Sequence, residues 1–292
     1  MAKKKLEDRG PVFITGTSTG IGAASALHLS ELGFRVFAGV RREKDGKALA
    51  ARAGNDLTPV LIDITDAAKI AAAAKTVADA VGRRGLAGLV NNAGIVRPGP
   101  LEFQPIDDFR MQLEVNLVGH LAVTQAFLPL IRLGRGRIVN VGSIGGLLVL
   151  PLHGAYSASK FGMEALSDAF RLELRQWKIP VSLVDPGATQ TAIFGKTLAA
   201  IDGVEEALHE AGDKQYDETI AAVRKLVKKT AADAADPIVL AKAVAHALTA
   251  DKPKTRYLAG HGAKEAEVLA RTTSDAMRDR AVAREVGLPK PE

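Results

Sequence analysis

Short apolar runs rich in β-branched residues alternate with longer stretches of helical periodicity along most of the chain. The apolar runs 12–15, 35–40, 59–62, 86–90, 136–141 and 181–184 predict strands, and the stretches 21–32, 43–53, 67–81, 106–133 and 155–177 predict helices. Such alternation is typical of parallel βαβ units, and nearly continuous apolar strands are typical of a sheet covered on both faces. The pattern therefore predicts an α/β fold with a doubly wound parallel sheet and a ligand crevice at the carboxyl ends of its strands.

The pattern changes after Thr191. Residues 193–235 are rich in Ala, Lys and Glu, read as helical and contain no predicted strand, so we expect a helical lid over the crevice. Asp236-Pro237 predicts the start of a helix that runs to Ala250, and 255–259 predicts a last strand, which brings the sheet to about seven strands. Residues 264–292 predict a surface helix and tail, and 1–9 a basic tail. With no repeat or linker, 1–292 is expected to be a single domain.

Composition excludes several classes of protein. Cysteine is absent, which excludes disulfides and Cys-based zinc sites. The net charge of +6 is dispersed and aromatic residues are only 4%, so no nucleic-acid partner is expected. Met1–Arg9 lacks the apolar core of a signal peptide, and no stretch approaches the roughly 18 uninterrupted apolar residues of a membrane span. We therefore expect a cytoplasmic protein without a membrane span.

A glycine-rich turn joins the first predicted strand to the first helix. Its residues are Thr15-Gly16-Thr17-Ser18-Thr19-Gly20-Ile21-Gly22. Glycines let the backbone turn tightly and approach a pyrophosphate, while the helix N-terminus directs amide groups and a partial positive charge at it. A glycine tract alone also suits a plain turn, but its place between strand and helix predicts a dinucleotide site, with Gly16, Ser18, Gly20, Ile21 and Gly22 as contacts. The fold is then of the Rossmann type.

The end of the second strand bears on the choice between NADP and NAD. It reads Ala38-Gly39-Val40-Arg41-Arg42, with no acid for a ribose 2′-hydroxyl and two guanidinium groups suited to a 2′-phosphate. We therefore expect NADP, with NAD as the alternative if the arginines only form a solvated loop. Asp63, after the third strand, is a candidate partner for the adenine amino group, or equally a cap of the helix that starts near Asp66.

Tyr156 and Lys160 are four residues apart at the start of a predicted helix, so their side chains share a face. Acid–base chemistry near neutrality needs the phenol pKa of about 10 lowered by about 3 pH units, or about 4 kcal/mol. One cation about 4 Å away at an effective dielectric near 20 supplies an energy of that size. We therefore expect Lys160 to lower the pKa of Tyr156 and make it a proton donor.

Several further motifs stand in order around this pair. Asn91-Asn92-Ala93-Gly94 follows the fourth strand, Asn116 lies in Glu114-Val115-Asn116-Leu117, Ser143 follows the fifth strand, and Pro186-Gly187 precedes Thr191. Together with the glycine turn and Tyr156-Ser157-Ala158-Ser159-Lys160, they resemble the short-chain dehydrogenase/reductase family from about Val12 to Thr191. The resemblance implies a dinucleotide-binding catalytic domain that moves hydride between a nicotinamide and a secondary alcohol or ketone.

The resemblance also implies roles for individual residues. Ser143 would hydrogen-bond the substrate oxygen, Tyr156 would exchange its proton, Lys160 would hold the nicotinamide ribose, and Asn116 would keep a water behind Lys160. The residues that would border the nicotinamide and line its crevice are Asn92, Ala93, Gly94, Pro186, Gly187, Thr189 and Thr191. Singly, each catalytic residue has an alternative: Asn116 a helix-bending polar group, Ser143 a turn hydroxyl, Lys160 a solvated lysine.

Histidines complete the list of candidates. His153 lies in an apolar stretch, which favours a substrate-pocket or packing role over acid–base catalysis. The remaining histidines, His28, His120, His209, His246 and His261, show no ligand spacing, so no metal is expected.

The tract 154–168, with Arg171-Leu172-Glu173-Leu174 and 256–260, is most similar to the branch that holds retinol, 17β-hydroxysteroid and 3-hydroxybutyrate dehydrogenases. The apolar loop 144–152 suits a lipophilic alcohol or ketone, although core packing explains its leucines equally well. Two alternatives are a ketoreductase of acyl thioesters or small ketones and a non-catalytic NADP-binding regulator. The resemblance further implies a homodimer or homotetramer.

Overall fold

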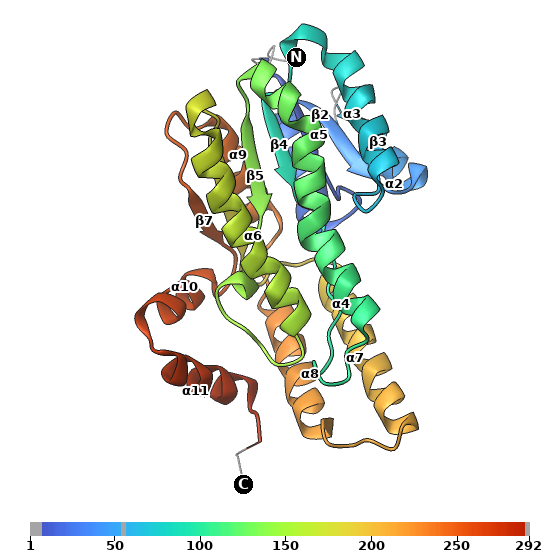
Figure 1. Ribbon diagram of the computed structural model, residues 1–292, viewed down its shortest axis with the longest axis vertical. Helices are drawn as coiled ribbons and strands as arrows, with labels where there is room; N and C mark the ends of the chain where they lie inside the picture. The colour runs from blue at the N-terminus through green and yellow to red at the C-terminus, as the bar shows by residue number, and fades with distance from the viewer. Residues whose placement is uncertain (1–7, 54–56, 290–292) are drawn as a thin grey trace, which may run out of the picture.

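The computed structural model describes residues 8–53 and 57–289, and within them one parallel sheet organises the fold (Figure 1). The strand order is β3-β2-β1-β4-β5-β6-β7 and every pairing is parallel. The strands are β1 (Pro11–Ile14), β2 (Arg35–Val40), β3 (Leu57–Leu61), β4 (Gly88–Asn91), β5 (Arg137–Val141), β6 (Val181–Pro186) and β7 (Arg256–Ala259). The doubly wound sheet expected from the sequence is confirmed.

The direction of strand addition reverses beside β1. The chain first adds β2 and β3 on one side of β1, then returns to place β4 on its other side. Such a reversal leaves a crevice at the carboxyl ends of the two central strands, because the connections leave them in opposite directions. The glycine turn follows β1 and Asn92 follows β4, so the sequence places both motifs at this crevice. Pro59, which lacks a donor for a ladder hydrogen bond, lies on the edge strand β3.

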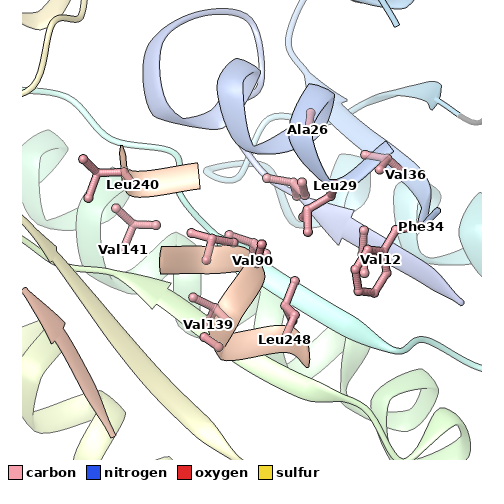
Figure 2. Close-up of a cluster of buried hydrophobic side chains, with 14 of the residues drawn as sticks. Val12, Ala26, Leu29, Phe34, Val36, Val90, Val139, Val141, Leu240 and Leu248 are labelled. Atoms are coloured by element: carbon pink, nitrogen blue, oxygen red, sulfur yellow. The ribbon is translucent and has the colours of Figure 1, made fainter. Parts of the chain in front are cut away.

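Helices cover both faces of the sheet, and the faces follow the period of two along each strand. Val12 and Ile14 of β1 point to the face covered by α1 (Gly20–Glu31) and α9 (Ile238–Thr249). Figure 2 shows this cluster, with Leu29 of α1 and Leu248 of α9 meeting the strand side chains. The short helix α2 (Glu43–Ala50) contributes Leu49 to the same cluster.

The opposite face buries Phe13 of β1, whose ring stacks on Phe127 with centroids 4.2 Å apart. It is covered by α3 (Ala67–Val81) with the short turn η1 (Gly82–Arg84), by α5 (Gly119–Gly134), and by α6 (Gly154–Glu173) with η4 (Leu174–Trp177). The helix α4 (Ile106–Leu113) and the π turn η2 (Glu114–Val118) lead into α5, and α4 packs on α6. The continuous helix Ile106–Gly134 is long and apolar enough to cross a bilayer by length and composition. Its Val123, Phe127 and Ile131 are fully buried in this cluster, and a helix buried in a protein core can be equally long and apolar.

The predicted lid region forms two helices beyond the carboxyl ends of the strands, α7 (Ile193–Glu210) and α8 (Asp217–Ala232) (Figure 1). We call them the α7–α8 hairpin. Its apolar side chains form a cluster of their own, centred on Ile201, Ile220 and Val223. Leu152, from the loop that holds the short turn η3 (Ile144–Gly146), is buried in the same cluster.

The C-terminal prediction was wrong in its main point. Residues 264–292 were expected to form one surface helix and a tail, but the chain forms α10 (Ala263–Thr272) and α11 (Asp275–Val286). Val286 is buried, and Val282 and Leu288 pack against the cluster of the α7–α8 hairpin. The end of the chain therefore covers the hairpin. Most of the basic tail predicted for 1–9 and the last three residues lie outside the described residues.

Candidate active site

The turn after β1 has the close backbone approach that its glycines predict. Gly16 and Gly20 have φ of 69° and 58°, which favours glycine. A Cβ on Gly16 would lie 2.6 Å from the Cα of Ala93, and a Cβ on Gly20 would lie 2.9 Å from Cγ2 of Thr191. The turn is therefore in contact with the segments that follow β4 and β6. Ile21 packs partly against the α1 and α9 cluster.

Asn92 fastens the glycine turn to the end of β4. Its amide nitrogen Nδ2 donates to the carbonyl oxygens of Thr15 and Gly16, at 2.9 and 3.0 Å, and its backbone N–H donates to Thr15 Oγ1 at 2.9 Å. The predicted crevice residue thus also has a structural role. Beside the first turn of α1 is a hollow of about 490 Å³, lined by Ser18, Thr19, Gly20, Ala23, Ala24, Arg52, Gln190, Thr191, Ala192, Asp236 and Pro237.

The two arginines after β2 differ in their surroundings. Arg42 is the residue before α2, and its guanidinium donates from Nε and Nη2 to both carboxylate oxygens of Asp45, at 2.8 and 3.2 Å. Arg41 is exposed and close enough to Asp63 to help lower the pKa of that carboxyl, which its burial opposes. Asp63 accepts from the backbone and side chain of Thr65, whereas Asp66 caps α3. The alternative that Asp63 caps this helix is therefore wrong.

Asn116 lies where the long helix opens into the π turn η2. Its side chain is fully buried; Oδ1 accepts from the N–H of Ile95 at 2.9 Å, and Nδ2 donates to the Ile95 carbonyl at 3.0 Å and to Ser159 Oγ at 3.1 Å. The widened turn directs this amide between the loop after β4 and α6. Asn116 therefore joins the loop after β4, at Ile95, to the helix that carries Tyr156 and Lys160.

Ser143 and Tyr156 meet at the carboxyl end of β5. Ser143 is the residue before η3 and caps it, because its Oγ accepts from the Gly145 N–H at 3.0 Å. A Cβ on Gly145 would lie 2.8 Å from Cε1 of Tyr156 and 3.4 Å from Oγ of Ser143, so the phenol ring lies against this turn. A hydrogen bond with Ser143 lowers the pKa of Tyr156, but burial raises it by more. Ser143 is thus both a turn hydroxyl and a neighbour of the phenol.

Lys160 is not a solvated lysine. It is 4% exposed, and its Nζ donates to the Val141 carbonyl at 2.9 Å and lies 5.9 Å from the centroid of the Tyr156 ring. Burial lowers the pKa of this ammonium to about 8, and the nearby Asp185 opposes that shift. The expected lowering of the Tyr156 pKa by Lys160 is wrong for these side chains, because desolvation of the phenol dominates.

The segment after β6 completes the crevice. Gly187 donates its N–H to the Ala259 carbonyl of β7 at 2.8 Å, and Thr189 Oγ1 donates to the Gly187 carbonyl at 3.1 Å. Pro186 ends the strand and Thr191 leads into α7. The predicted cofactor residues outside α6 thus follow the carboxyl ends of β1, β4 and β6, and those of β2 and β3 in the case of Arg41, Arg42 and Asp63. Ser143 lies at the end of β5, between β4 and β6.

Residues 11–202 match the short chain dehydrogenase family. The chain belongs to the short-chain dehydrogenase/reductase family, a family of oxidoreductases. It is 38% identical to retinol dehydrogenase 7 of Rattus norvegicus over 261 residues, which covers 87% of this chain and 81% of the relative. It is 38% identical to 17-beta-hydroxysteroid dehydrogenase type 6 of Homo sapiens over 263 residues, with the same coverage of 87% and 81%. These relatives confirm the branch expected from the sequence.

A solved structure extends the likeness to the fold. A short chain dehydrogenase from Burkholderia cenocepacia, determined in complex with NADP, superposes with a TM-score of 0.69. It is 26% identical in sequence, and the match covers 97% of this chain and 100% of that one.

The sequence did not reveal the place of one buried polar residue of this short-chain dehydrogenase/reductase, His120. His120 is 1% exposed and its Nε2 lies 2.7 Å from the Ala93 carbonyl oxygen, while its Nδ1 has no partner among the described residues. Burial, together with the charge of Lys160, lowers the pKa of His120 to about 3, so the ring is neutral. Its place one turn after Asn116 on a core helix was the only signal in the sequence.

Two other histidines can be compared with their predictions. His153 lies edge-on to Tyr156 with ring centroids 6.4 Å apart, and its Nδ1 lies 3.1 Å from the Pro151 carbonyl oxygen, in agreement with a packing or pocket role. His209 was given no ligand spacing, yet its ring, Glu205 and Asp217 bring ligand atoms within 4.8 Å of one another at the tip of the α7–α8 hairpin. Arg224 already pairs with Glu205 there. The prediction of no metal stays a prediction.

Proposed function

We propose that this protein is an NADP(H)-preferring dehydrogenase/reductase that interconverts a lipophilic secondary alcohol and its ketone, with Tyr156 as the general acid and base. The observation that carries the proposal is the juxtaposition of Ser143, Tyr156 and the buried Lys160 at the carboxyl end of β5, beside the glycine crevice. All four residues of the expected catalytic set, Asn116, Ser143, Tyr156 and Lys160, are present. No comparably specific observation favours an alternative function.

The residues present fit a dinucleotide. The backbone positions at Gly16 and Gly22 leave no room for a side chain, and α1 presents its N-terminal amides in the same turn, which suits a pyrophosphate. When bound, the nicotinamide supplies or accepts the hydride. Lys160 would hold the ribose, and Pro186 to Thr191 would border the nicotinamide.

The chain's own residues manage charge and protons at the substrate oxygen. As a ketone is reduced, negative charge grows on its oxygen, and the hydroxyls of Ser143 and Tyr156 stabilise that charge by hydrogen bonding. The Tyr156 hydroxyl then gives its proton to this oxygen, and the Lys160 ammonium stabilises the resulting phenolate. In the oxidation of an alcohol, the same phenolate takes the proton back. Asn116 would hold the π turn η2 in place, beside the route by which solvent returns a proton to Tyr156.

The preference for NADP is supported by the arginines after β2. Arg41 is exposed at the crevice edge and forms no ion pair within residues 8–53 and 57–289, so its guanidinium is available for a 2′-phosphate. Arg42 would have to exchange Asp45 for the phosphate or support Arg41 through charge alone. The structurally similar Burkholderia cenocepacia protein was determined with NADP.

A lipophilic substrate is supported by the loop between Ser143 and Tyr156. Leu150 and Leu152 pack into the cluster of the α7–α8 hairpin, whereas Val149 is 51% exposed and Leu147 and Leu148 are half-buried. Core packing thus uses only part of the apolar loop. The names of the relatives, retinol dehydrogenase and 17-beta-hydroxysteroid dehydrogenase, agree with an apolar alcohol or ketone.

The test is turnover of retinal, a 17-ketosteroid, an acetoacetyl thioester and cyclohexanone with NADPH and with NADH, in the wild type and in Tyr156→Phe. We expect NADPH-dependent reduction of the 17-ketosteroid that is lost in Tyr156→Phe, while NADPH binding measured by fluorescence stays within about threefold. Turnover of retinal alone, which is an aldehyde, would replace the secondary alcohol of the proposal by a primary one. Equal turnover in the variant would overturn the role of Tyr156. A preference for NADH would overturn the role of Arg41, and exclusive turnover of the thioester would favour the ketoreductase.

We also propose a cytoplasmic homodimer or homotetramer. Exposed apolar side chains on the helices α4 to α6 support association, among them Met111, Val118, Leu133, Phe161 and Leu172. Light scattering after size-exclusion chromatography would measure the mass directly, and a monomer would contradict the proposal. Cell fractionation tests the compartment.

A further inference from the structure

A charged cluster lies directly beneath the Ser143 turn and is not explained by the roles given above. Asp185, at the end of β6, has a fully buried side chain, and Arg256 of β7 forms ion pairs with it and with Glu164 of α6. The guanidinium also donates from Nη1 to Glu164 Oε1 at 2.7 Å. Arg256 and Glu164 are mostly buried themselves, at 19% and 15% exposed. Charged groups are seldom buried in this way without a specific partner.

The Asp185 oxygen that does not face Arg256 lies against the turn that carries Ser143. Oδ1 of Asp185 accepts the backbone N–H of Ser143 at 3.1 Å, while its other oxygen faces Arg256. Gly142 makes the approach possible, because a Cβ there would lie 2.0 Å from this Oδ1. The carboxylate therefore fixes the backbone at the residue whose hydroxyl lies beside Tyr156.

The cluster also balances the charge of Lys160. Two cations, Lys160 and Arg256, face two acids, Asp185 and Glu164, in one buried region, and Lys160 and Glu164 are one helical turn apart on α6. Asp185 favours the charged form of Lys160. Removal of Arg256 would leave two buried acids without the cation that pairs with both of them.

We infer that Asp185 is a positioning residue for the reaction: held by Arg256, its carboxylate anchors the backbone N–H of Ser143 and so holds the Ser143 hydroxyl beside Tyr156. This inference rests on the proposed function for its kinetic consequence, but not for its structural one. Asp185 touches neither the substrate oxygen nor the nicotinamide in this role; it acts through Ser143.

The kinetic test is a double-mutant cycle at saturating NADPH, with the carbonyl compound of the panel that the wild type reduces fastest. We expect Asp185→Ala to lower kcat about 10- to 100-fold, the size expected for a lost hydrogen bond to a charged group. In a Ser143→Ala background the same change should cost less than about threefold, because no hydroxyl is left to position. Asp185→Asn, which keeps an oxygen acceptor, should restore kcat to within about fivefold of the wild type.

The structural test needs no turnover. Hydrogen exchange of the amides in 142–147 should accelerate at least about tenfold in Asp185→Ala and little in Asp185→Asn. Arg137→Met is the matched control. Arg137 also lies on a strand, but at the amino end of β5, where it donates to the carbonyls of Ala247 and Ala250. It should lower stability without changing kcat or this exchange.

Equal losses of kcat in both backgrounds, or unchanged exchange at Ser143, would overturn the inference. If Asp185→Ala does not fold, Arg256→Gln takes its place in the cycle and in the exchange measurement, because it frees the carboxylate from its cation. If the wild type turns over no compound of the panel, the proposed function fails, and the exchange measurement still decides whether Asp185 anchors Ser143.

Discussion

Substitution of Gly22 by Ala tests how tightly the crevice is built. A Cβ on Gly22 would lie 2.3 Å from the Gly16 carbonyl oxygen and 2.4 Å from Nδ2 of Asn92. Ordinary contacts lie beyond about 3.4 Å, so both of these groups, or the helix that carries Gly22, must move by about 1 Å. Overpacking costs about 1 to 3 kcal/mol, and loss of the two Asn92 hydrogen bonds at 2.9 and 3.0 Å adds about 1 kcal/mol each.

We therefore expect Gly22→Ala to lower the free energy of unfolding by about 3 to 5 kcal/mol and to weaken NADPH binding at least about tenfold. Urea unfolding can be followed by the fluorescence of Trp177, the single tryptophan, which stacks on Arg132 with its guanidinium carbon 4.1 Å from the ring centroid. NADPH binding is measured by titration of the native protein.

Gly203→Ala is the matched control. Gly203 lies inside α7, and no atom of the described residues lies within 4 Å of its would-be Cβ. This change should leave NADPH binding unaltered and raise stability by up to about 1 kcal/mol, because Ala favours a helix over Gly. A Gly22→Ala variant with wild-type stability and wild-type NADPH binding would refute the close packing of this turn.

Three further changes have defined outcomes. Arg41→Ala should weaken NADPH binding about tenfold and leave NADH binding within about twofold, because only NADPH carries the 2′-phosphate. Phe127→Ala should lower the free energy of unfolding by about 3 to 5 kcal/mol, because the ring is fully buried and stacks on Phe13. His120 should make the protein acid-sensitive: its pKa of about 3 in the fold lies below its ordinary value of 6.5. Unfolding between these pH values takes up a proton, so stability falls with pH, by about 2 to 3 kcal/mol from pH 7 to pH 4.5 in urea unfolding.

Each of these has its own control. Arg52→Ala changes an exposed arginine beside the first turn of α1 and should affect both dinucleotides alike; an equal effect of Arg41→Ala would contradict the 2′-phosphate assignment. Phe127→Leu should lose less stability than Phe127→Ala, and equal losses would mean that ring stacking and volume do not matter. In His120→Gln the acid-dependent loss should shrink, and an unchanged pH slope would place the titration elsewhere.

The fold was predictable where a segment itself contains the residues that mark the start and end of its helix or strand. The predicted ranges of β2 and α3 agree with the structure because β2 is apolar from Val36 to Val40 and Asp66 supplies the cap of α3. The start of β4 was placed two residues early: Leu86 is apolar and buried, but its N–H donates to the Leu130 carbonyl of α5, outside the ladder. Apolarity identifies burial, whereas the ladder depends on a partner that one segment does not reveal.

Long-range partners explain what the sequence did not reveal at the site. The positions of Ser143, Tyr156 and Lys160 follow from ordered motifs. Whether the pKa of Tyr156 rises or falls depends instead on how much water the fold excludes from the phenol. Asp185 and Arg256 lie 71 residues apart, and only the sheet order brings β6 beside β7. An acid near the end of a mostly apolar strand was the one available sign. The packing of α11 on the hairpin likewise joins segments far apart in the chain.

The hairpin cluster shares no residue with the two clusters that bury the sheet. Substitutions among its side chains, such as Ile201, Val223 or Val286, therefore leave the packing of the strands untouched. If the hairpin is the lid that the sequence predicts over the crevice, its side chains can diverge between relatives at little cost to the framework that binds the dinucleotide. A library confined to the hairpin and the chain's end would be a practical route to new substrate ranges on an unchanged catalytic base.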